Sequence, residues 1–476
     1  MFQRIKRLFV GEDNTATIDV VRAAPPPSPL APVDLTDPGQ VAGVMDLAGR
    51  IGGILLASGT SNNDSKAQIK AVASAYGLHY CHVDITLNTI TIFAYLNSKK
   101  QPLSVFHSVR RLSIDFSKLS DVDQLVRSIT AGATPPDVAE RALDDIMSAK
   151  PPFGFRMSLV GWALMAAAVA IMLGGGFMVA VLAFATTSVI VAGMAWLDRR
   201  NLPLFFQNLY GGLIATVPAA ITYKWAMLSG IELPPSQVIA SGIIVMLAGL
   251  TLVQALQDGI TGAPVTASAR FFETILLTGG IVAGVGLGIE LSGALGVTLP
   301  TWETTAVTAS VSSVMIKVIS GAAASAAFAI ACYAKWDSVF VSALTALAGS
   351  FIYYCVLIPH GVGPIVATAI SATVIGLAGG LLARRFSIPP LITAVAGITP
   401  LLPGLSIYRA MYAMMHDQML MSYSLSVIAL GTASALAAGV VLGEWIARKL
   451  RRPPRFNPYK AFRRRPKSAF QRSANN

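Results

Sequence analysis

The chain has 476 residues, of which 54% are hydrophobic and only 13% are charged, and its formal net charge is +12. A soluble protein with so few charged side chains could not cover its surface, so the composition excludes a purely soluble globular protein. Eleven Lys and Arg and no acid fall in residues 448–476, whereas residues 1–150 hold 15 basic and 15 acidic side chains. This charge layout is typical of a membrane protein whose basic segments face the cytoplasm.

Residues 1–38 predict an N-terminal segment without a globular fold. Basic and apolar residues alternate in the stretch from Met1 to Val10, which fits either a short amphipathic helix on the membrane surface or a disordered end. Residues 23–38 are rich in proline and predict an extended linker.

Residues 39–150 predict a small cytoplasmic α+β domain. Apolar residues recur at helical spacing in two stretches, β-branched and aromatic residues fill three more, and two helices follow. The helical stretches are 41–58 and 64–76, the later helices start near Leu119 and at Pro135, and the strands are 78–84, 86–95 and 103–109.

Four residues of this domain, His79, Cys81, His82 and His107, raise the question of a metal site. Strand alternation sends His82 to the opposite face from His79 and Cys81, and no closing pair of ligands follows. No metal is therefore expected.

The polar run 58–64 fits a hydrolase site or, equally, the cap of a helix that begins after Ser61. The chain contains neither a Gly-x-Ser-x-Gly elbow nor a GxxxxGK[ST] phosphate loop. The sequence thus predicts no catalytic residue, no cofactor and no ATP-driven transport.

From Phe153 onward, ten apolar runs are long enough to cross a hydrocarbon layer of about 30 Å as helices. The chain is therefore predicted to be an α-helical polytopic membrane protein with ten transmembrane helices. The runs lie near 157–173, 176–196, 207–227, 237–256, 271–291, 312–332, 338–358, 363–383, 387–412 and 422–446.

The loops between these runs predict the orientation, because Lys and Arg collect on the cytoplasmic side. Ten spans with both ends in the cytoplasm make every inner loop basic. The inner loops then hold Arg199, Arg200, Arg270, Lys335, Arg384, Arg385 and the basic tail, and the outer loops hold Lys224, Glu232, Glu303, His360 and His416.

An internal repeat relates the fourth run to the ninth at an offset of 155 residues. Gly249 matches Gly404 and Thr251 matches Ser406, and a pair of prolines precedes each copy. The repeating unit has five spans, so its second copy must insert upside down, which predicts two inverted five-helix repeats of the kind found in many secondary transporters. The predicted segments are 1–38, 39–150, 151–300, 301–447 and 448–476.

Paired Gly and Pro interruptions in corresponding spans indicate a binding site, because a broken helix frees backbone groups for a substrate. Such interruptions occur at Gly249 and at Pro403-Gly404, and the hydroxyls of Thr251 and Ser406 are expected to line the cavity. Ordinary helix packing by small residues is the alternative.

Arg409 follows Gly404 by five residues, about 8 Å along the helix towards the outer face. A charge at that depth is a candidate partner for a substrate carboxylate. The competing interpretation is that the side chain reaches the outer headgroups.

The connection after the fourth span, residues 257–274, is rich in Gly, Ala, Ser and Thr and holds Asp258, Arg270 and Glu273. Asp258 and Glu273 are candidates for proton coupling, because burial raises the pKa of a carboxyl group and a nearby Arg lowers it. An inner-loop salt bridge explains the same residues. In the fifth span, Gly280, Gly284 and Gly288 predict close packing against another helix.

Three stretches of the chain resemble the bacterial threonine/serine exporter family, and the likeness extends over nearly the whole sequence. They are LAGRIGGILLASGTSNNDSKAQIKAVASAYGL (47–78), LQDGITGAPVTASARFFET (256–274) and AGITPLLPGLSIYRAMYA (396–413). The family's pattern of Asp-x-x-x-Gly followed by Arg-x-x-Glu, and its Pro-Gly element, fall on Asp258, Gly262, Arg270, Glu273, Pro403 and Gly404.

The resemblance implies a ten-span secondary exporter that moves threonine and serine outward at the expense of the proton motive force, as an antiporter. Relatives split into two subunits are associated with dicarboxylate export, so substrate identity stays open. A membrane-anchored hydrolase and a passive channel are rival hypotheses. The expected partners are threonine, serine, protons and anionic lipid headgroups at the basic tail; no nucleic acid is expected, and homo-oligomerisation is left open.

Overall fold

The computed structural model describes residues 33–96, 101–109, 114–132, 134–230, 233–246, 248–297, 311–415 and 418–450. The predicted amphipathic start, most of the proline-rich linker and most of the basic tail lie outside these residues. Of the two units into which the chain divides, the larger is the stretch Pro26–Ala447. The larger unit holds the α+β part and the apolar helices.

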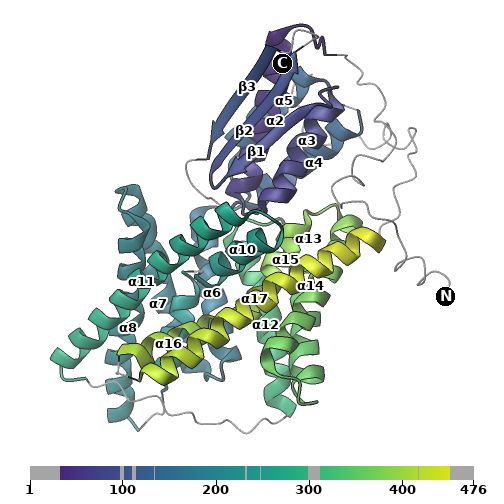
Figure 1. The fold of residues 1–476 in the computed structure, drawn as a ribbon. Coiled ribbons are helices and arrows are strands. Elements are labelled where there is room, and N and C mark those ends of the chain that lie inside the picture. Colours follow the sequence, from purple (N-terminus) through teal and green to yellow (C-terminus); the bar gives the residue numbers. More distant parts are fainter. Residues whose placement is uncertain are drawn as a thin grey trace, which may run out of the picture. The chain divides into compact units, whose positions relative to one another are not determined.

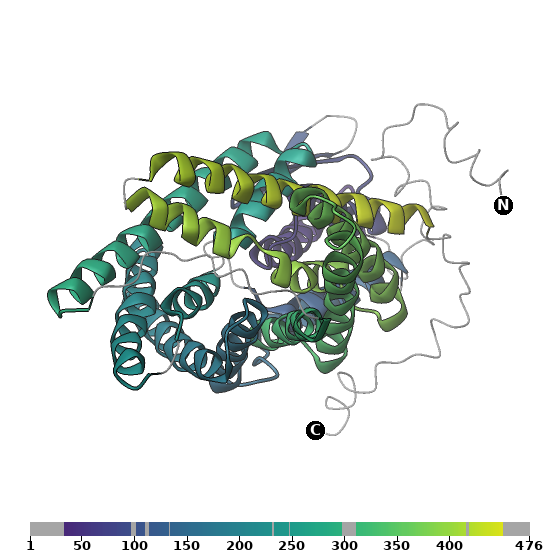
Figure 2. The same cartoon turned by 90° about the horizontal axis from the view of Figure 1, so that it is seen from below.

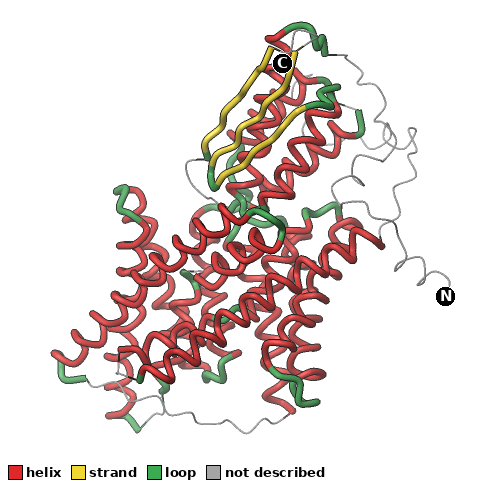
Figure 3. Tube along the Cα trace, in the orientation of Figure 1, coloured by secondary structure: helices red, strands yellow, loops and turns green. Residues whose placement is uncertain are grey.

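The α+β part is a three-stranded antiparallel sheet in the order β1-β2-β3, with helices against one face (Figures 1 and 3). The predicted three strands and four helices are confirmed, with boundaries that differ by a few residues. The elements are α2 (Pro38–Ala57), α3 (Asn62–Ala75), β1 (Cys81–Thr86), β2 (Thr89–Leu96), β3 (Gln101–Ser108), α4 (Phe116–Thr130) and α5 (Pro136–Ser148).

Strand alternation gives this sheet one buried face and one open face. Ile90 and Ile92 on β2 are fully buried, and they belong to the same core as Ile51 of α2. Phe93 and Tyr95 of the same strand point the other way and are exposed. The period of two in the sequence therefore places the core on the side of the helices.

The start of α3 confirms the predicted cap. The side-chain oxygen of Ser61 accepts a hydrogen bond from the backbone N–H of Asp64 at 3.2 Å, and the Ser61 hydroxyl donates to the Asp64 carboxylate at 2.9 Å. Ser61 thereby satisfies a backbone donor that the first turn of a helix leaves without an intrahelical partner.

Nine helices in the described part of the chain are long and apolar enough to cross a membrane. One of them is α2, which packs on the sheet of the α+β part instead. The other eight match eight of the ten predicted runs, and the fourth and ninth runs are the two without a matching long helix. They are α6 (Phe155–Met172), α7 (Phe177–Arg199), α8 (Leu204–Leu228), α11 (Pro264–Ala294), α12 (Val311–Ala331), α13 (Trp336–Phe351) continued by the π-helical turn η1 (Ile352–Leu357), α14 (Pro364–Phe386) and α17 (Met419–Leu450).

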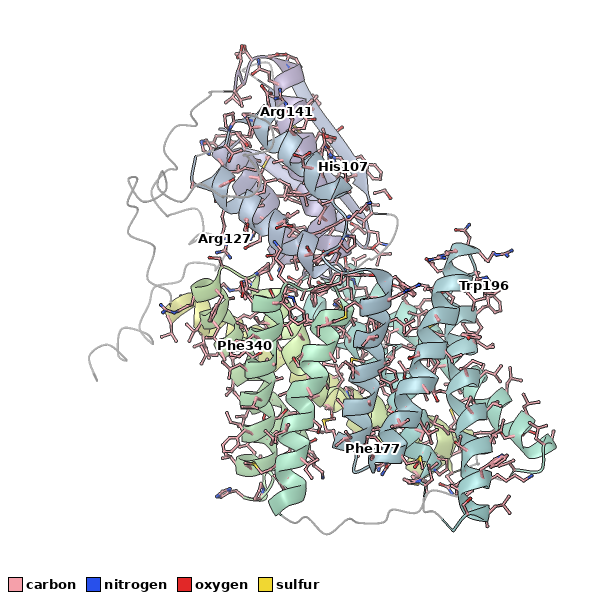
Figure 4. The ribbon with its side chains drawn as sticks, turned by 180° about the vertical axis from the view of Figure 1, so that it is seen from behind. His107, Arg127, Arg141, Phe177, Trp196 and Phe340 are labelled. Carbon is pink, nitrogen blue, oxygen red and sulfur yellow. The ribbon has the colours of Figure 1, made fainter. Side chains whose placement is uncertain are left out.

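Helix α7 shows why these helices suit a bilayer. Its 23 residues rise about 35 Å, close to the thickness of a hydrocarbon layer. Phe177 and Trp196, near its two ends, are exposed and project from the ribbon (Figure 4). The guanidinium of Arg200 lies 5.3 Å from the Trp196 ring, and an aromatic ring beside a basic group is typical of a membrane interface.

The fourth and ninth predicted runs are each broken into two helices. The first is α9 (Pro235–Ile244) followed by α10 (Ala248–Ile260), and the second is α15 (Pro390–Ile398), the short 3₁₀ turn η2 (Thr399–Leu401) and α16 (Gly404–Met415). Proline opens both α9 and α15, at the helix position where a missing N–H costs no hydrogen bond.

The connection predicted over 257–274 is shorter than expected. Helix α10 continues to Ile260 and α11 begins at Pro264, so only three residues separate them. Gly262 takes a φ of +93°, which ends α10, and Pro264 fits the first turn of α11. The small residues after Pro264 therefore belong to a helix rather than to a loop.

The same helix pairings occur in both halves of the apolar region. Helix α9 packs against α6, α7 and α8, and α15 packs against α12, α13 and α14. Helices α6 and α12 contact each other. Figure 2 shows blue and teal helices of the first half on one side and green helices of the second half on the other, while the yellow-green helices α16 and α17 extend across to the teal side.

The glycine ridge of α11 packs closely against α8, as predicted. A Cβ at Gly280 would lie 2.5 Å from the Phe205 carbonyl oxygen, and one at Gly284 would overlap the Leu209 carbonyl. Gly439 of α17, which lies 155 residues after Gly284, is equally close to the Ala369 carbonyl of α14. Both ridges let two helix backbones approach each other.

Candidate functional site

The two interrupted helices meet at their breaks. Helix α16 contacts both α9 and α10. A Cβ placed on Gly404, the first residue of α16, would lie 3.1 Å from Cγ1 of Ile244, the last residue of α9. Gly249 lies in the first turn of α10, and Pro403 directly precedes α16. The structure thus places Gly404, at the second break, against the last residue of α9, at the first break.

This junction joins helix ends of opposite polarity. The C-terminal end of α9 carries carbonyl groups and a partial negative charge, whereas α10 and α16 begin there with backbone N–H groups and a partial positive charge. Such an arrangement can attract both an anionic and a cationic group of one small ligand.

The predicted polar residues beside the junction lie on α10 and α16. Thr251 is half-buried on α10, and Ser406 is half-buried on α16. Arg409 is also half-buried, slightly more than one helical turn after Gly404. The structure therefore places all three within the two broken helices.

A buried ion pair lies at the far end of α10. Arg270 Nη1 of α11 donates a hydrogen bond to Asp258 Oδ2 at 2.8 Å, and the two side chains are 7% and 1% exposed. The remaining donors of Arg270, Nε and Nη2, are buried and make no hydrogen bond to the described residues. Removal of one partner from a buried charge pair of this kind strongly destabilises the folded protein, because the other charge stays buried without a counter-charge.

The α+β part contributes the next contact of this carboxylate. The backbone N–H of Asn62, the first residue of α3, donates to Asp258 Oδ1 at 3.1 Å. The Asn62 side-chain amide donates to Thr266 Oγ1 of α11 at 2.7 Å. Thr266 also accepts the backbone N–H of Leu87 at 3.2 Å, so both α3 and the β1–β2 turn dock there.

Burial raises the pKa of Asp258 above its ordinary value. The positive charge of Arg270 and the hydrogen bond from Asn62 oppose this shift of the pKa, and the carboxylate of Asp64 adds to it. Desolvation disfavours the charged carboxylate, so the group takes up a proton more readily than an exposed Asp.

The structure does not bring Glu273 into this pair. Glu273 lies one turn after Arg270 on the exposed side of α11, while Asp258 and Arg270 are buried. Glu290, further along α11, is exposed as well. Of the two acids proposed from the sequence for proton coupling, Asp258 is therefore the one in a buried polar environment.

The α+β part also attaches to the loop between α12 and α13. The backbone N–H of Phe116, at the start of α4, donates to the Cys332 carbonyl at 2.9 Å, and both residues are buried. Lys335 pairs with Asp121 of α4 at the surface. The α+β part thus contacts residues within 151–300 and residues within 301–447.

The candidate metal ligands of the α+β part are dispersed. His107 Nε2 lies 3.1 Å from Asp46 Oδ1, His82 is exposed on the open face of the sheet, and Cys81 is half-buried on β1. Within the described residues, no cluster of three or more His, Cys, Asp or Glu has a geometry that could hold a metal ion.

Sequence reasoning missed Asn62 and Thr266 as parts of the site. Asn62 is separated from Asp258 by 196 residues and from Thr266 by 204, so no local spacing connects them. The only available signal was an Asn pair directly after a helix cap, which usually remains in solvent. In this protein the first Asn is fully buried.

Comparisons with known proteins give a consistent result. Residues 46–292 match the family described as putative threonine/serine exporter, and residues 317–446 match the family described as Threonine/Serine exporter, ThrE. No solved structure matches the chain.

Two curated proteins are similar over most of their length. The threonine/serine exporter of Corynebacterium glutamicum is 61% identical over 460 residues, which cover 96% of this chain and 94% of that protein. The probable threonine/serine exporter of Mycobacterium tuberculosis is 36% identical over 413 residues, which cover 86% of this chain and 77% of that protein. With these matches and its apolar helices, the chain is a multi-pass membrane protein that belongs to the threonine/serine exporter family.

Proposed function

We propose that this protein is a secondary active exporter of threonine and serine, driven by the proton motive force through alternating access of two inverted repeats. The observation that carries the proposal is the contact between the two broken helices at Ile244 and Gly404. A membrane anchor has no need for two interrupted helices that meet, whereas a transporter uses them to build a central site. The two similar proteins, which are named as exporters of these amino acids, supply the substrates.

The inverted repeat has support beyond the sequence offset. Two helices broken after corresponding proline pairs pack against three neighbours in their own half, and glycine ridges at Gly284 and Gly439 pack in corresponding places. We assign residues 151–300 to the first repeat and 301–447 to the second, with residues 39–150 as the α+β domain. Rocking of one repeat against the other would open the junction to each side in turn.

A hydroxy amino acid fits the polarity of the junction. Its carboxylate needs the N-terminal end of a helix or a cation such as Arg409, and its ammonium needs carbonyl groups like those at the end of α9. The hydroxyls of Thr251 and Ser406 are suitable partners for the side-chain hydroxyl of threonine or serine.

Asp258 is the proposed proton carrier, with Arg270 as its charge partner. A proton that enters from outside would neutralise the carboxylate and weaken the ion pair, and release into the cytoplasm would restore it. Glu273 is the alternative carrier on the same helix as Arg270.

The proposed location is the bacterial cytoplasmic membrane, with both termini inside. The α+β part contacts residues of the α10–α11 turn and of the α12–α13 loop, and the loop charges assign both connections to the cytoplasmic side. A single docked domain could not reach loops on opposite sides of a bilayer, so these contacts agree with the predicted topology.

Transport in inverted membrane vesicles tests the proposal. Vesicles containing the protein should accumulate labelled threonine and serine when a proton gradient is imposed, and an uncoupler should abolish the accumulation. A panel of dicarboxylates in the same assay tests the alternative substrate class. Uptake that equilibrates without accumulating and ignores the uncoupler would indicate a passive channel instead.

A further inference from the structure

Asn62 makes two different contacts with the membrane helices. Its backbone N–H donates to the Asp258 carboxylate at 3.1 Å, and its side chain donates to the Thr266 hydroxyl at 2.7 Å. Asn62 and Asp258 are both 0% exposed, and Thr266 is 2% exposed. These are the contacts of a packed polar interface and not of a surface loop.

The backbone contact places Asp258 at the N-terminal end of α3. Asn62 is the first helical residue, so its N–H has no intrahelical partner and is available to an outside acceptor. A carboxylate at this position is stabilised by the hydrogen bond and by the helix dipole, and both favour its charged form.

We propose that Asn62 is a positioning residue for Asp258, so that the α+β domain completes the Asp258–Arg270 site instead of only lying beside it. The backbone N–H of Asn62 holds one carboxylate oxygen while Arg270 holds the other. Its side chain fixes Thr266 and thereby keeps α3 docked on α11. This inference rests on the proposed role of Asp258 in proton coupling.

Few charged groups face Asp258. Arg270 of α11 contacts it directly, and the carboxylate of Asp64 on α3 acts on it from a greater distance. The other polar residues at this contact, Asn62 of α3 and Thr266 of α11, are neutral. The hydrogen bond from Asn62 is therefore a separable influence on the protonation of Asp258.

Asn62→Pro removes this hydrogen bond, and its Cδ, which takes the place of the N–H, also displaces the Asp258 oxygen that lies 3.1 Å from the nitrogen. Proline is tolerated at the first position of a helix. Ser61, which would precede it, has φ −59° and ψ 151°, the extended conformation that a residue before proline prefers. Asn62→Pro should therefore keep α3, and Asn62→Ala separates the two contacts because it loses the side chain but retains the N–H.

The measurement is gradient-driven threonine export as a function of cytoplasmic pH. Release of the proton inside requires Asp258 to ionise, so export should fall on the acid side near the pKa of Asp258. Loss of one hydrogen bond to a charged group should move this acid limb upward by about one pH unit in Asn62→Pro relative to the wild type. A purely structural role would lower the rate without moving the limb.

Asp258→Asn in the same assay separates the coupling role of Asp258 from the positioning role of Asn62. If this variant exports at the wild-type rate, the proposed coupling role is wrong. If it loses export and neither Asn62→Pro nor Asn62→Ala moves the acid limb, while both proteins melt near the wild-type temperature, the coupling role stands and the positioning role is wrong.

Should Asn62→Pro fail to accumulate in the membrane, Thr266 offers a second test. Thr266→Val keeps the shape of the side chain but removes the acceptor that docks α3, whereas Thr266→Ser retains the hydroxyl. An upward shift of the acid limb in Thr266→Val that is absent in Thr266→Ser supports the inference, and equal profiles overturn it.

Discussion

At the scale of single residues, the decisive feature is a buried carboxylate shared between two parts of the chain. Asp258 accepts hydrogen bonds from Arg270 of α11 and from Asn62 of the α+β domain. Burial raises the pKa of Asp258, and both partners lower it. A group balanced in this way can change protonation when either partner moves.

Asp258→Asn should abolish gradient-driven export while leaving threonine exchange across the membrane, because exchange needs no net proton release. The measurement is accumulation under a proton gradient compared with counterflow of labelled threonine in its absence. If Glu273→Gln gives this pattern instead, Glu273 carries the proton. If both variants export normally, the coupling site lies elsewhere, with Glu290 as the next candidate.

Arg409 should respond differently from Asp258. Loss of a partner for the substrate carboxylate weakens binding itself, by about 1.5–3 kcal/mol for a charged hydrogen bond, so Arg409→Ala should impair both export and exchange about tenfold or more. The KM for threonine in exchange is the sensitive readout. An unchanged KM would favour the interpretation that Arg409 reaches the headgroups.

At the scale of elements, much of the architecture could be predicted because its causes are local. Strand alternation, the cap at Ser61 and the length of eight apolar helices are all properties of neighbouring residues. The paired glycines indicated the breaks of the fourth and ninth runs to within a few residues, because α10 begins at Ala248 and α16 at Gly404. Local patterns succeed here because backbone geometry and the hydrophobic effect act in the same direction.

Two features could not be predicted, and each depends on distant contacts. Residues 264–274 resemble a loop in composition, but Pro264 starts a helix whose small residues allow close packing. The docking of Asn62 on Asp258 joins residues 196 apart, which no spacing rule connects.

The two interruptions should behave as a pair. A leucine at Gly404 would press against Ile244 at the end of α9, and Gly249 is the second residue of α10. Either change should reduce export more than about tenfold while folded protein still reaches the membrane. Gly279→Leu is the control, because a Cβ on Gly279 meets no atom within 4 Å. Normal export by both junction variants would remove the basis for a site at the breaks.

The glycine ridges should affect stability and not the site. Alanine at Gly284 or at Gly439 forces α11 away from α8, or α17 away from α14, and overpacking of this kind costs about 1–3 kcal/mol. Both variants should melt at lower temperature in detergent than the wild type, whereas Gly279→Ala should not. Equal melting of Gly284→Ala and Gly279→Ala would show that the ridge is not under packing constraint.

At the scale of the whole molecule, the α+β domain is docked on two loops that belong to different halves. It holds the α10–α11 turn through Asn62 and the α12–α13 loop through Phe116 and Asp121. Any motion of one half against the other must then strain or release one of these attachments. The attachment at Asp258 includes a carboxyl group that can gain or lose a proton. The buried hydrogen bond from the Phe116 N–H to the Cys332 carbonyl includes no such group.

The polar residues 58–64 should have a structural role and not a catalytic one. The Ser58 hydroxyl donates to the Ile54 carbonyl at 2.8 Å, which is an ordinary contact within a helical turn, so Ser58→Ala should leave most export intact. Ser61→Ala removes the cap of α3 and should lower stability by about 1 kcal/mol. Complete loss of export in Ser58→Ala at an unchanged protein level would support a catalytic role for this domain.

Membrane topology can be tested on loops that the structure shows to be accessible. In a variant whose three native cysteines are replaced by alanine, single cysteines at Gly176 and Gly363 should react with an impermeant maleimide added to intact cells. Both glycines are exposed, and a Cβ there meets no atom within 4 Å. Both have negative φ, unlike their neighbours Gly174 and Gly361, so the cysteine side chain introduces no backbone strain.

A cysteine at Ser468, in the basic tail, should react only after the membrane is opened, because eleven basic and no acidic residues in 448–476 hold that end in the cytoplasm. A cysteine at Asn63, beside the docking contact of α3, should likewise be protected in intact cells. If Ser468→Cys or Asn63→Cys is labelled from outside as fast as Gly176→Cys, the orientation is reversed. Asp258 would then lie on the outer side, and its proposed proton release into the cytoplasm would have to be abandoned.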